Sequence, residues 1–290
     1  MHEYGELLEN VNLKKYNTYK IGGHSKYLIK PYNIKCLKNL IEYLKNNKIK
    51  YIVLGKGSNV ILPDEDYDGT IILLEKLNKI EIENNIVNAE SGILLNTFIN
   101  KLINNNLGGL ENLYGIPGTL GGAIVQNAGC YSSEISDYIE SITYLKDNEI
   151  KTINKEDCDF SYRDSIFKKD KDIILLSASF KLYNKDKKEM KEIIKNNMNK
   201  RKSSQPLEYP NAGSVFRNPK DLSAGKLIDD LNLKGYHIND AYISNKHANF
   251  IINKGNSSSE DIKLLIEHIK KEIYKNYKIE LILEQEIVKY

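Results

Sequence analysis

The chain has 290 residues, of which 41% are hydrophobic, and this is enough for two domains with ordinary cores. Its 42 basic and 39 acidic residues leave a net charge of +3 and form no basic stripe, so we expect no nucleic-acid partner. The longest aliphatic runs have the length of strands, so we expect no membrane segment.

The N-terminus and the cysteines narrow the class of protein further. Residues 1–6 are acidic and lack the apolar core of a secretory signal, which predicts a cytoplasmic protein. Cys36, Cys130 and Cys158 are odd in number and form no C-x-x-C pair. We therefore expect no disulfide framework, and we expect no metal site because the histidines show no metal-binding spacing either.

The N-terminal part of the chain contains a polar turn, a helix and a buried strand. Asn17 to Gly23 is the polar turn, which we interpret as an arm laid across a cleft, and the short strand 27–29 follows it. Apolar residues recur at helical spacing from Ile34, with Asn33 as the N-cap. The buried strand is predicted at 51–54.

The strand at 51–54 runs directly into Gly55-Lys-Gly-Ser-Asn59, which has the composition of a phosphate-binding loop. It lacks the third glycine of a dinucleotide fingerprint and the G-K-[ST] of a P-loop. We interpret it as one of two glycine-rich loops that hold an extended cofactor from two sides.

The second of these loops is Gly115 to Gly129, which is rich in glycine and carries no charged residue. Glycine permits positive φ and lets the backbone approach a ligand, and successive N–H groups can hold phosphate oxygens. A plain turn needs only one or two glycines, so a fifteen-residue loop of this kind indicates a ligand, most naturally a diphosphate.

Between and after these loops the pattern alternates between hairpins and helices. Residues 80–87 predict a hairpin that turns at Asn84-Asn85, and residues 94–103 predict a helix that ends at Gly108-Gly109. Strands are predicted at 139–145 and 149–153, joined at Asp147-Asn148, and at 173–182. There is no regular βαβ alternation, so the predicted fold class is α+β.

A charged helix after Leu182 is interpreted as a bridge to a second domain that begins near Arg201. That domain contains a predicted helix from Ser223, a strand at 248–252, a helix opened by a capping box of Ser257 and Glu260, and a final strand at 279–288.

Arg163 and Ser214 are candidate catalytic residues, each with a structural alternative. Arg163 lies among aromatic and hydroxyl residues, where a guanidinium can grip a carboxylate, but a surface ion pair with Asp164 would also explain it. Ser214 follows a glycine and has no histidine near it in the sequence, so a proton donor suits it better than a nucleophile; an ordinary turn serine is the alternative.

Two further polar places lie near the C-terminus. Glu284 and Glu286 share one face of a predicted strand, where carboxylates could act in a site or protect a sheet edge. His247 lies in a polar cluster at 244–250, and a lone histidine is more often a hydrogen-bonding residue than a catalyst.

Taken together, these segments resemble the UDP-N-acetylenolpyruvoylglucosamine reductase (MurB) family over nearly the whole chain. The matching stretches, in the family's order, are 17–23, 54–59, 115–129, 162–165, 211–219, 224–229, 244–250 and 283–287.

The resemblance implies an FAD-binding domain of the vanillyl-alcohol-oxidase (PCMH) type and a C-terminal α+β substrate-binding domain. The FAD-binding domain would occupy residues 1–200, with subdomains at about 1–76 and 77–200, and the substrate-binding domain would occupy 201–290. The implied FAD-binding residues are Leu54, Gly55, Lys56, Gly57, Ser58, Asn59, Gly115, Ile116, Pro117, Gly118, Thr119, Gly121, Gly122, Asn127, Ala128 and Gly129.

The resemblance also implies the reaction. NADPH reduces the non-covalently bound FAD, and the enolpyruvyl ether of UDP-N-acetylglucosamine then receives hydride at C3 and a proton at C2, giving UDP-N-acetylmuramate for peptidoglycan synthesis. By motif, Arg163 and Glu286 would stabilise the charge on the substrate carboxylate, and Ser214 would supply the proton. The implied substrate-binding residues are Tyr162, Asn218, Lys234 and His247. We expect a monomer whose small-molecule substrate is UDP-N-acetylglucosamine-enolpyruvate, with NADPH as the hydride donor.

The chain departs from the family pattern at Lys56, Cys130 and Ser132, and the short spacing from Arg163 to Ser214 indicates the compact form that lacks a substrate-covering tyrosine insertion. Two alternatives remain in other classes. One is a related flavin oxidase of the same fold, in which Cys130 tethers the flavin. The other is a non-catalytic protein that binds UDP-sugars.

Overall fold

The computed structural model describes residues 1–290, and the chain folds into two compact units. The first unit comprises residues 1–9, 27–56 and 69–199, and the second comprises 10–26, 57–68 and 200–290. The second unit therefore contains two N-terminal segments in addition to the C-terminal residues that the sequence indicated. The assignment of FAD binding to residues 1–200 and of substrate binding to 201–290 stays a prediction.

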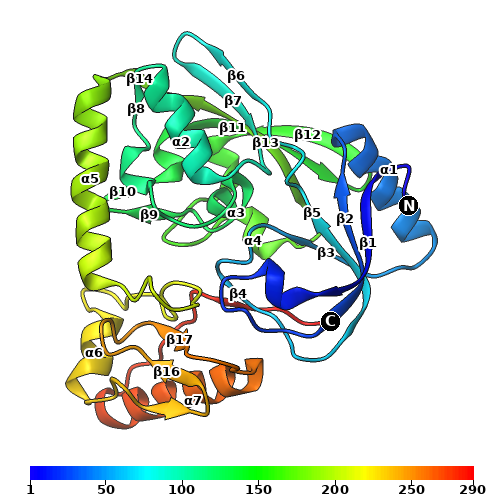
Figure 1. Ribbon diagram of the computed structural model, residues 1–290. Coiled ribbons are helices and arrows are strands. Elements are labelled where there is room, and N and C mark those ends of the chain that lie inside the picture. The colour runs from blue at the N-terminus through cyan, green and yellow to red at the C-terminus, as the bar shows by residue number, and fades with distance from the viewer. The chain divides into compact units, whose positions relative to one another are not determined.

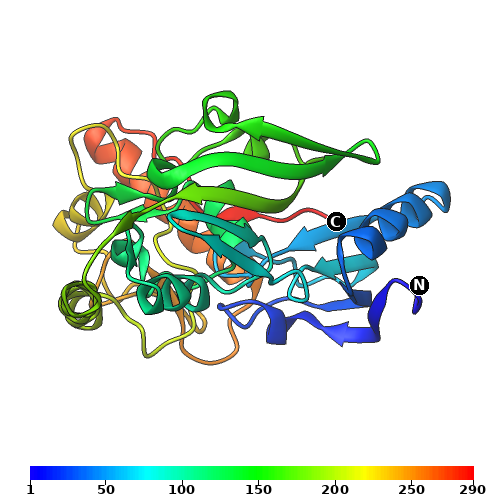
Figure 2. The same ribbon diagram turned by 90° about the horizontal axis from the view of Figure 1, so that it is seen from above.

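The first unit contains a five-stranded antiparallel sheet (Figures 1 and 2). Its strand order is β12 (Glu149–Asn154), β11 (Ile139–Lys146), β13 (Ile174–Lys181), β7 (Ile86–Glu90) and β6 (Ile80–Glu83). Both predicted hairpins are confirmed. Asn84 turns between β6 and β7 at φ 56°, and Asp147 and Asn148 turn between β11 and β12 at φ 49° and 59°. Asparagine and aspartate tolerate this left-handed conformation better than most residues do.

Helices α2 (Leu95–Asn104), α3 (Leu120–Val125) and α4 (Ile166–Lys169) share a core with this sheet (Figure 1). Phe98 of α2 and Phe180 of β13 are fully buried, with ring centroids 5.2 Å apart. The predicted end of α2 at Gly108 is wrong, because Gly108 belongs to strand β8 (Leu107–Gly108), which pairs with β14 (Tyr183–Asn184). Helix α2 ends four residues earlier, at Asn104.

A second sheet has the order β1 (Gly5–Asn12), β2 (His24–Pro31), β5 (Tyr67–Leu73) and β3 (Tyr51–Leu54). The predicted helix beside it is α1 (Ile34–Asn46), and Asn33 is confirmed as its N-cap because its side chain accepts a hydrogen bond from Cys36 N at 2.9 Å. The leucines of α1 are buried in one cluster with Ile29, Ile72 and Leu176.

The predicted charged helix is α5 (Lys187–Ser204), and the division between the two units falls inside it. The remaining elements of the first unit are short. They are β9 (Gly129–Cys130), β10 (Ser133–Glu134) and the 3-10 helices Glu111–Leu113, Ile135–Tyr138 and Lys155–Cys158.

The second unit contains α6 (Ala224–Asp230), α7 (Ser259–Tyr277) and a three-stranded antiparallel sheet of β15 (His237–Ile238), β16 (Ala241–Ile243) and β17 (Ile251–Asn253) (Figure 1). Its core is formed with residues from the N-terminal segment that follows the 3-10 helix Leu13–Tyr16. The interpretation of 17–23 as an arm across a cleft is wrong, because Tyr19 and Ile21 are fully buried in this core and Asn253 Nδ2 donates to Tyr19 O at 2.9 Å.

Helix α7 begins one residue later than predicted. Its N-cap is Ser258, whose Oγ accepts from Asp261 N at 3.0 Å, while the Asp261 carboxylate accepts from Ser258 N at 2.8 Å. The capping box is therefore Ser258 with Asp261 and not Ser257 with Glu260.

The predicted strand at 279–288 is reduced to β18 (Glu286–Ile287), which pairs in parallel with β4 (Val60–Ile61). Leu283 forms an isolated bridge with Phe216 instead. The segment changes partner along its length, so it does not form one continuous strand.

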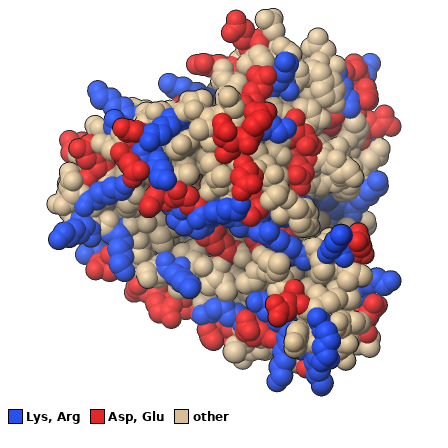
Figure 3. Space-filling model, turned by 180° about the vertical axis from the view of Figure 1, so that it is seen from behind, with Lys and Arg blue, Asp and Glu red and all other residues tan.

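Acidic and basic side chains are interspersed on the face of the molecule in Figure 3. None of the helices is both long enough and apolar enough to cross a membrane. The structure also contains no cluster of three or more His, Cys, Asp or Glu residues placed to hold a metal ion.

Candidate active site

The glycine-rich segment 115–129 contains helix α3 and is therefore not one continuous loop. Thr119 is the N-cap of α3, and its Oγ1 accepts a hydrogen bond from Gly122 N at 3.2 Å. A threonine cap satisfies one of the backbone donors that a helix N-terminus leaves open. The cap explains why a helix forms here although Gly121 and Gly122 disfavour one.

Several N–H groups of this segment bind the protein itself. Leu120 N donates to Ile93 O and Gly121 N to Ser91 O, both at 2.8 Å, and Gly115 N donates to the Asn96 side chain at 2.8 Å. A Cβ on Gly121 would lie 2.8 Å from the Ser91 Cβ. Packing within the protein therefore explains this glycine without a bound ligand. The N–H groups of Gly118 and Thr119 have no acceptor within the chain.

The first glycine-rich loop lies against the second at Gly55. A Cβ on Gly55 would lie 2.9 Å from Thr119 Oγ1, and the N–H groups of Gly55 and Lys56 have no acceptor within the chain. The four open N–H groups of Gly55, Lys56, Gly118 and Thr119 thus come from two loops in contact. Backbone donors of this kind are suited to phosphate oxygens, so these residues fit an FAD diphosphate.

Residues 57–59 belong to the second unit and are held there by the backbone. Gly57 has φ 65°, and a Cβ on it would collide with Tyr16 O. Asn59 O accepts from Glu286 N at 3.0 Å, and Asn59 Nδ2 donates to Glu284 O at 3.1 Å. Leu54 is buried at the end of β3, and the side chain of Lys56 is exposed.

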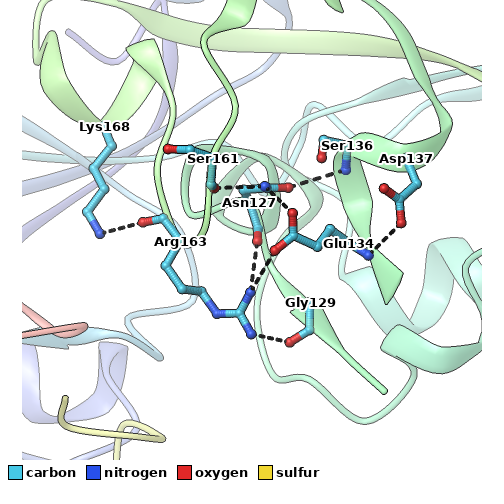
Figure 4. A network of polar contacts seen from close by, with 8 residues as sticks. All are labelled: Asn127, Gly129, Glu134, Ser136, Asp137, Ser161, Arg163 and Lys168. Carbon is cyan, nitrogen blue, oxygen red and sulfur yellow. Dashed lines mark hydrogen bonds and ion pairs between the residues drawn. The ribbon is translucent and has the colours of Figure 1, made fainter. Parts of the chain in front are cut away.

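Asn127 is buried and its side chain is engaged within the protein. Its Nδ2 donates to Glu134 Oε2 at 2.7 Å and to Ser161 O at 2.9 Å, and Ser136 N donates to its Oδ1 at 3.4 Å. Both amide hydrogens of Asn127 are therefore used by the protein, and its side chain connects the end of the glycine-rich segment to the chain near Arg163 (Figure 4).

Arg163 lies at the tip of a tight turn closed by two hydrogen bonds between Ser161 and Asp164, and its φ is 57°. Its Nη1 donates to Asn127 O at 3.3 Å and to Glu134 Oε1 at 3.4 Å, and its Nη2 donates to Gly129 O (Figure 4). Its side chain is only 16% exposed. Arg163 forms an ion pair with Glu134, whereas the alternative from the sequence was an ion pair with Asp164, which lies 3.8 Å from Lys169.

Two further neighbours, Tyr162 and Lys168, contact Arg163. The exposed ring of Tyr162 lies under the guanidinium, with 4.9 Å between Arg163 Cζ and the ring centroid. Lys168 Nζ donates to Arg163 O at 3.2 Å and to Gln126 Oε1 at 2.7 Å. Nothing in the sequence singles out Lys168 or Glu134, since each is one of many charged residues in this chain.

Ser214 is half-buried, and its hydroxyl has no hydrogen-bond partner in the protein. Its backbone neighbours are fixed on both sides. Gln285 Nε2 donates to Gly213 O at 3.2 Å, and Val215 N donates to Asn249 O at 2.9 Å. Asn249 and Gln285 are both buried, and neither was predicted, although each lies inside a polar cluster that the sequence indicated.

Ser214 and Glu286 lie on adjacent segments of the second unit. Glu284 N donates to Val215 O at 2.9 Å, which pairs the segment of Ser214 with the segment of Glu286. Glu286 is half-buried on β18, where its N–H binds Asn59 O at 3.0 Å. The structure therefore brings Ser214, Glu286 and the end of the first glycine-rich loop together, as three neighbouring segments.

Three of the candidate substrate-binding residues surround α6. Asn218 Oδ1 accepts from Ala224 N at 3.1 Å at its N-terminus, and a Cβ on Gly225 would lie 3.2 Å from His247 Cε1. Lys234 pairs with Asp229 at 2.5 Å near the other end of the helix. Burial of the ring, with a smaller contribution from the Lys234 ammonium, lowers the pKa of His247 below its ordinary value, so the neutral imidazole is favoured.

The cysteines differ in their environments. Cys130 is half-buried beside Gly129, and its Sγ donates to Asn112 O at 2.8 Å. Burial raises the pKa of the Cys158 thiol to about 12, which keeps this residue protonated and unreactive.

Comparison with known proteins shows which family the chain resembles. Residues 25–150 match the FAD binding domain model, and residues 205–288 match the model of the UDP-N-acetylenolpyruvoylglucosamine reductase C-terminal domain. The UDP-N-acetylenolpyruvoylglucosamine reductase of Clostridium novyi is 43% identical over 98% of this chain and 92% of its own length. The protein of the same name from Caldicellulosiruptor saccharolyticus is 41% identical over 97% and 91%.

Among solved structures, UDP-N-acetylenolpyruvylglucosamine reductase (MurB) from Thermus caldophilus matches 98% of this chain and 99% of its own length, with a TM-score of 0.83 and 30% identity. These matches confirm the predicted fold class, an α+β flavoprotein with a PCMH-type FAD-binding domain. The chain belongs to the UDP-N-acetylenolpyruvoylglucosamine reductase (MurB) family.

Proposed function

We propose that the protein is an FAD-containing oxidoreductase that uses NADPH to reduce the enolpyruvyl ether of UDP-N-acetylglucosamine-enolpyruvate to UDP-N-acetylmuramate, a step of peptidoglycan precursor synthesis. The observation that carries this proposal is the similarity, over 97–98% of the chain, to relatives named for this reaction. The C-terminal family model supports it further, because it covers the segments that contain Ser214 and Glu286.

The open N–H groups of Gly55, Lys56, Gly118 and Thr119 would hold the FAD diphosphate. Bound FAD supplies the transfer of hydride from NADPH to C3 of the enolpyruvyl group. The other predicted FAD-binding residues of the two glycine-rich segments would shape the cradle, in part by packing: Gly57 and Gly121 both lie against neighbouring protein atoms.

Arg163 would stabilise the negative charge that develops on the enolpyruvyl carboxylate as hydride arrives at C3. A fixed donor at such a charge is worth about 3 kcal/mol when water is excluded. Ser214 would then give a proton to C2, and its hydroxyl is suited to this because the protein makes no competing hydrogen bond to it. Glu286 would act beside Ser214, on the adjacent segment.

Tyr162, Asn218, Lys234 and His247 would bind the rest of the nucleotide sugar. Lys234 is the residue suited to its diphosphate, because an ammonium group offers a point charge to phosphate oxygens. His247 would act as a neutral hydrogen-bonding group, since its pKa is lowered.

The test uses the flavin spectrum of the purified protein. We expect a yellow protein that bleaches when anaerobic NADPH is added and regains its colour when UDP-N-acetylglucosamine-enolpyruvate follows. A UDP-sugar-binding protein without catalysis would leave NADPH unoxidised. A flavin oxidase with a flavin tethered at Cys130 would keep its colour on the precipitate after acid denaturation, and it would be reoxidised by oxygen without the enolpyruvyl substrate.

We also propose that the enzyme is a monomer and that it works in the cytoplasm, where NADPH is available. Light scattering coupled to size-exclusion chromatography tests the first proposal, with an expected mass near 33.3 kDa. Fractionation of cells that express the protein tests the second.

A further inference from the structure

Glu134 makes contacts with both parts of the chain that meet at Arg163. Its Oε1 lies 3.4 Å from Arg163 Nη1, and its Oε2 accepts from Asn127 Nδ2 at 2.7 Å (Figure 4). The same Asn127 amide donates to Ser161 O at 2.9 Å, at the base of the turn that carries Arg163. One carboxylate therefore fixes the guanidinium directly and the base of its turn through Asn127.

Two further acceptors of the guanidinium are of a different kind. Asn127 O and Gly129 O are backbone carbonyls of the glycine-rich segment and carry no net charge. The guanidinium is charged in all of these hydrogen bonds, and with a carboxylate it gains in addition the coulombic attraction between opposite charges. The Glu134 carboxylate is thus a charged partner of Arg163, beside the two carbonyls.

Glu134 is itself held in place. Its N–H donates to Asp137 Oδ2 at 2.8 Å, in the capping box of the 3-10 helix Ile135–Tyr138. It also pairs with Gly129 across the β9–β10 turn. The carboxylate accordingly extends from a fixed backbone, and its side chain is about one-third exposed.

We propose that Glu134 is a positioning residue that holds the Arg163 guanidinium in register with the glycine-rich segment, and thereby with the cofactor. This inference rests on the proposed function, in which Arg163 binds the substrate carboxylate. It assigns to Glu134 no contact with substrate or flavin. Its effect is confined to ligands with a carboxylate for Arg163 to grip.

The test is Glu134→Gln, which removes the charge and keeps the size of the side chain. Flavin content and the rate of flavin reduction by NADPH should match the wild type. Reoxidation by the enolpyruvyl substrate should slow by about tenfold or more, because small displacements of a positioned group cost up to 10²-fold. In calorimetry, affinity for UDP-N-acetylmuramate, which has the carboxylate, should fall, whereas affinity for UDP-N-acetylglucosamine, which lacks it, should not change.

Asp170→Asn is the matched control, since Asp170 is also a one-third exposed carboxylate of the first unit, paired with Lys146 at 2.7 Å. This variant should behave as wild type in every one of these measurements. Glu134→Asp should show a smaller loss of reoxidation rate than Glu134→Gln. Aspartate keeps the charge, but its side chain is one methylene too short to reach both Arg163 and Asn127.

A double-mutant cycle with Arg163→Lys shows whether Glu134 acts through Arg163. In the Arg163→Lys background, Glu134→Gln should slow reoxidation by less than about twofold, because residues that act as one unit are non-additive. A full additional loss would overturn the proposal, and so would a Glu134→Gln variant that loses flavin, that slows both half-reactions equally or that behaves as wild type.

Failure of the proposed function would look different. If the wild-type flavin were not reoxidised by the enolpyruvyl substrate, the assigned reaction would be wrong. The comparison of the two UDP-sugar ligands would still report whether Glu134 controls recognition of a carboxylate.

Discussion

Arg163 in the first unit and Ser214 in the second unit are held in opposite ways. The Arg163 side chain is fixed directly by hydrogen bonds to Asn127 O, Gly129 O and Glu134. The Ser214 side chain has no hydrogen bond in the protein, and only its backbone neighbours are fixed.

The difference matches the chemistry proposed for each residue. A cation that stabilises developing charge acts best when it is held in advance and does not need to reorient. A hydroxyl that gives up a proton must direct its hydrogen toward the substrate, which a competing acceptor in the protein would oppose. The candidate cation is thus held through its side chain, and the candidate proton donor through the backbone beside it.

The largest expected effect comes from breaking the side-chain arrangement with Arg163→Lys. An ammonium group cannot reach three acceptors and also offer a planar pair of donors to a carboxylate. We expect turnover to fall by about 10²–10³-fold, the loss measured when one oxyanion donor is removed. Flavin content and the NADPH half-reaction serve as internal controls and should be unchanged. Turnover near the wild-type rate would mean that Arg163 has only a structural role.

Ser214→Ala tests the other side of the comparison and should affect one half-reaction only. Reduction of the flavin by NADPH requires no proton from this hydroxyl, so its rate should be nearly intact. Reoxidation by the enolpyruvyl substrate should slow by at least ~10²-fold, the lower end of what a positioned general acid contributes. Stopped-flow absorbance separates the two steps.

The matched control is Ser203→Ala, because Ser203 is an exposed serine of the second unit whose hydroxyl donates to Lys200 O at 2.9 Å. It should leave both half-reactions unchanged. If Ser214→Ala slowed both half-reactions equally, Ser214 would position the flavin or the fold; if it slowed neither, another group protonates C2.

The glycines of α3 give a smaller effect and show which part of the cradle faces the cofactor. Gly122 is exposed, and a Cβ there would be in ordinary contact with Thr119 Oγ1 at 3.5 Å. Gly122→Leu should therefore keep or raise the stability of the apoprotein, because leucine favours a helix more than glycine does. We expect it to weaken FAD affinity by about tenfold, or 1.4 kcal/mol, measured by flavin fluorescence.

Gly121→Val is the comparison variant, because its side chain would collide with Ser91 inside the protein. It should lower the apoprotein melting temperature, so loss of flavin from it alone says little about the cradle. Full flavin affinity in Gly122→Leu would show that this side of α3 does not approach the cofactor.

The parts of the fold that depend on neighbouring residues could be predicted from the sequence. Asn33 caps α1, and Asn84, Asp147 and Asn148 turn the two hairpins, since caps and tight turns are decided within a few residues. Helix α3 was missed because its glycines disfavour a helix; Thr119 and the carbonyls of Ser91 and Ile93 compensate for them.

Long-range partners could not be predicted. Tyr19 OH donates to Gln285 Oε1 at 3.0 Å across 266 residues, and this contact helps to place an N-terminal segment in the second unit. Arg163 and Ser214 could be named as candidates from the sequence because their motifs are local. Glu134 was missed because its contact with Arg163 spans 29 residues and has no periodic signal in the sequence.

The smallest expected effect concerns His247 of the second unit. It tests whether the protein around this side chain changes its pKa. Burial, with a smaller contribution from Lys234, lowers its pKa in the folded state, so the unfolded chain binds more protons below the ordinary pKa of about 6.5. The free energy of unfolding should therefore be highest above this pH and fall as the pH decreases toward the folded-state pKa.

His247→Gln should remove the part of this pH dependence that comes from the imidazole. Urea unfolding of both proteins at pH 7.5 and pH 5.5 measures it: the loss of stability on acidification should be smaller in the variant. Equal losses in the two proteins would mean that the imidazole titrates alike in the folded and unfolded states, and that His247 is open to solvent.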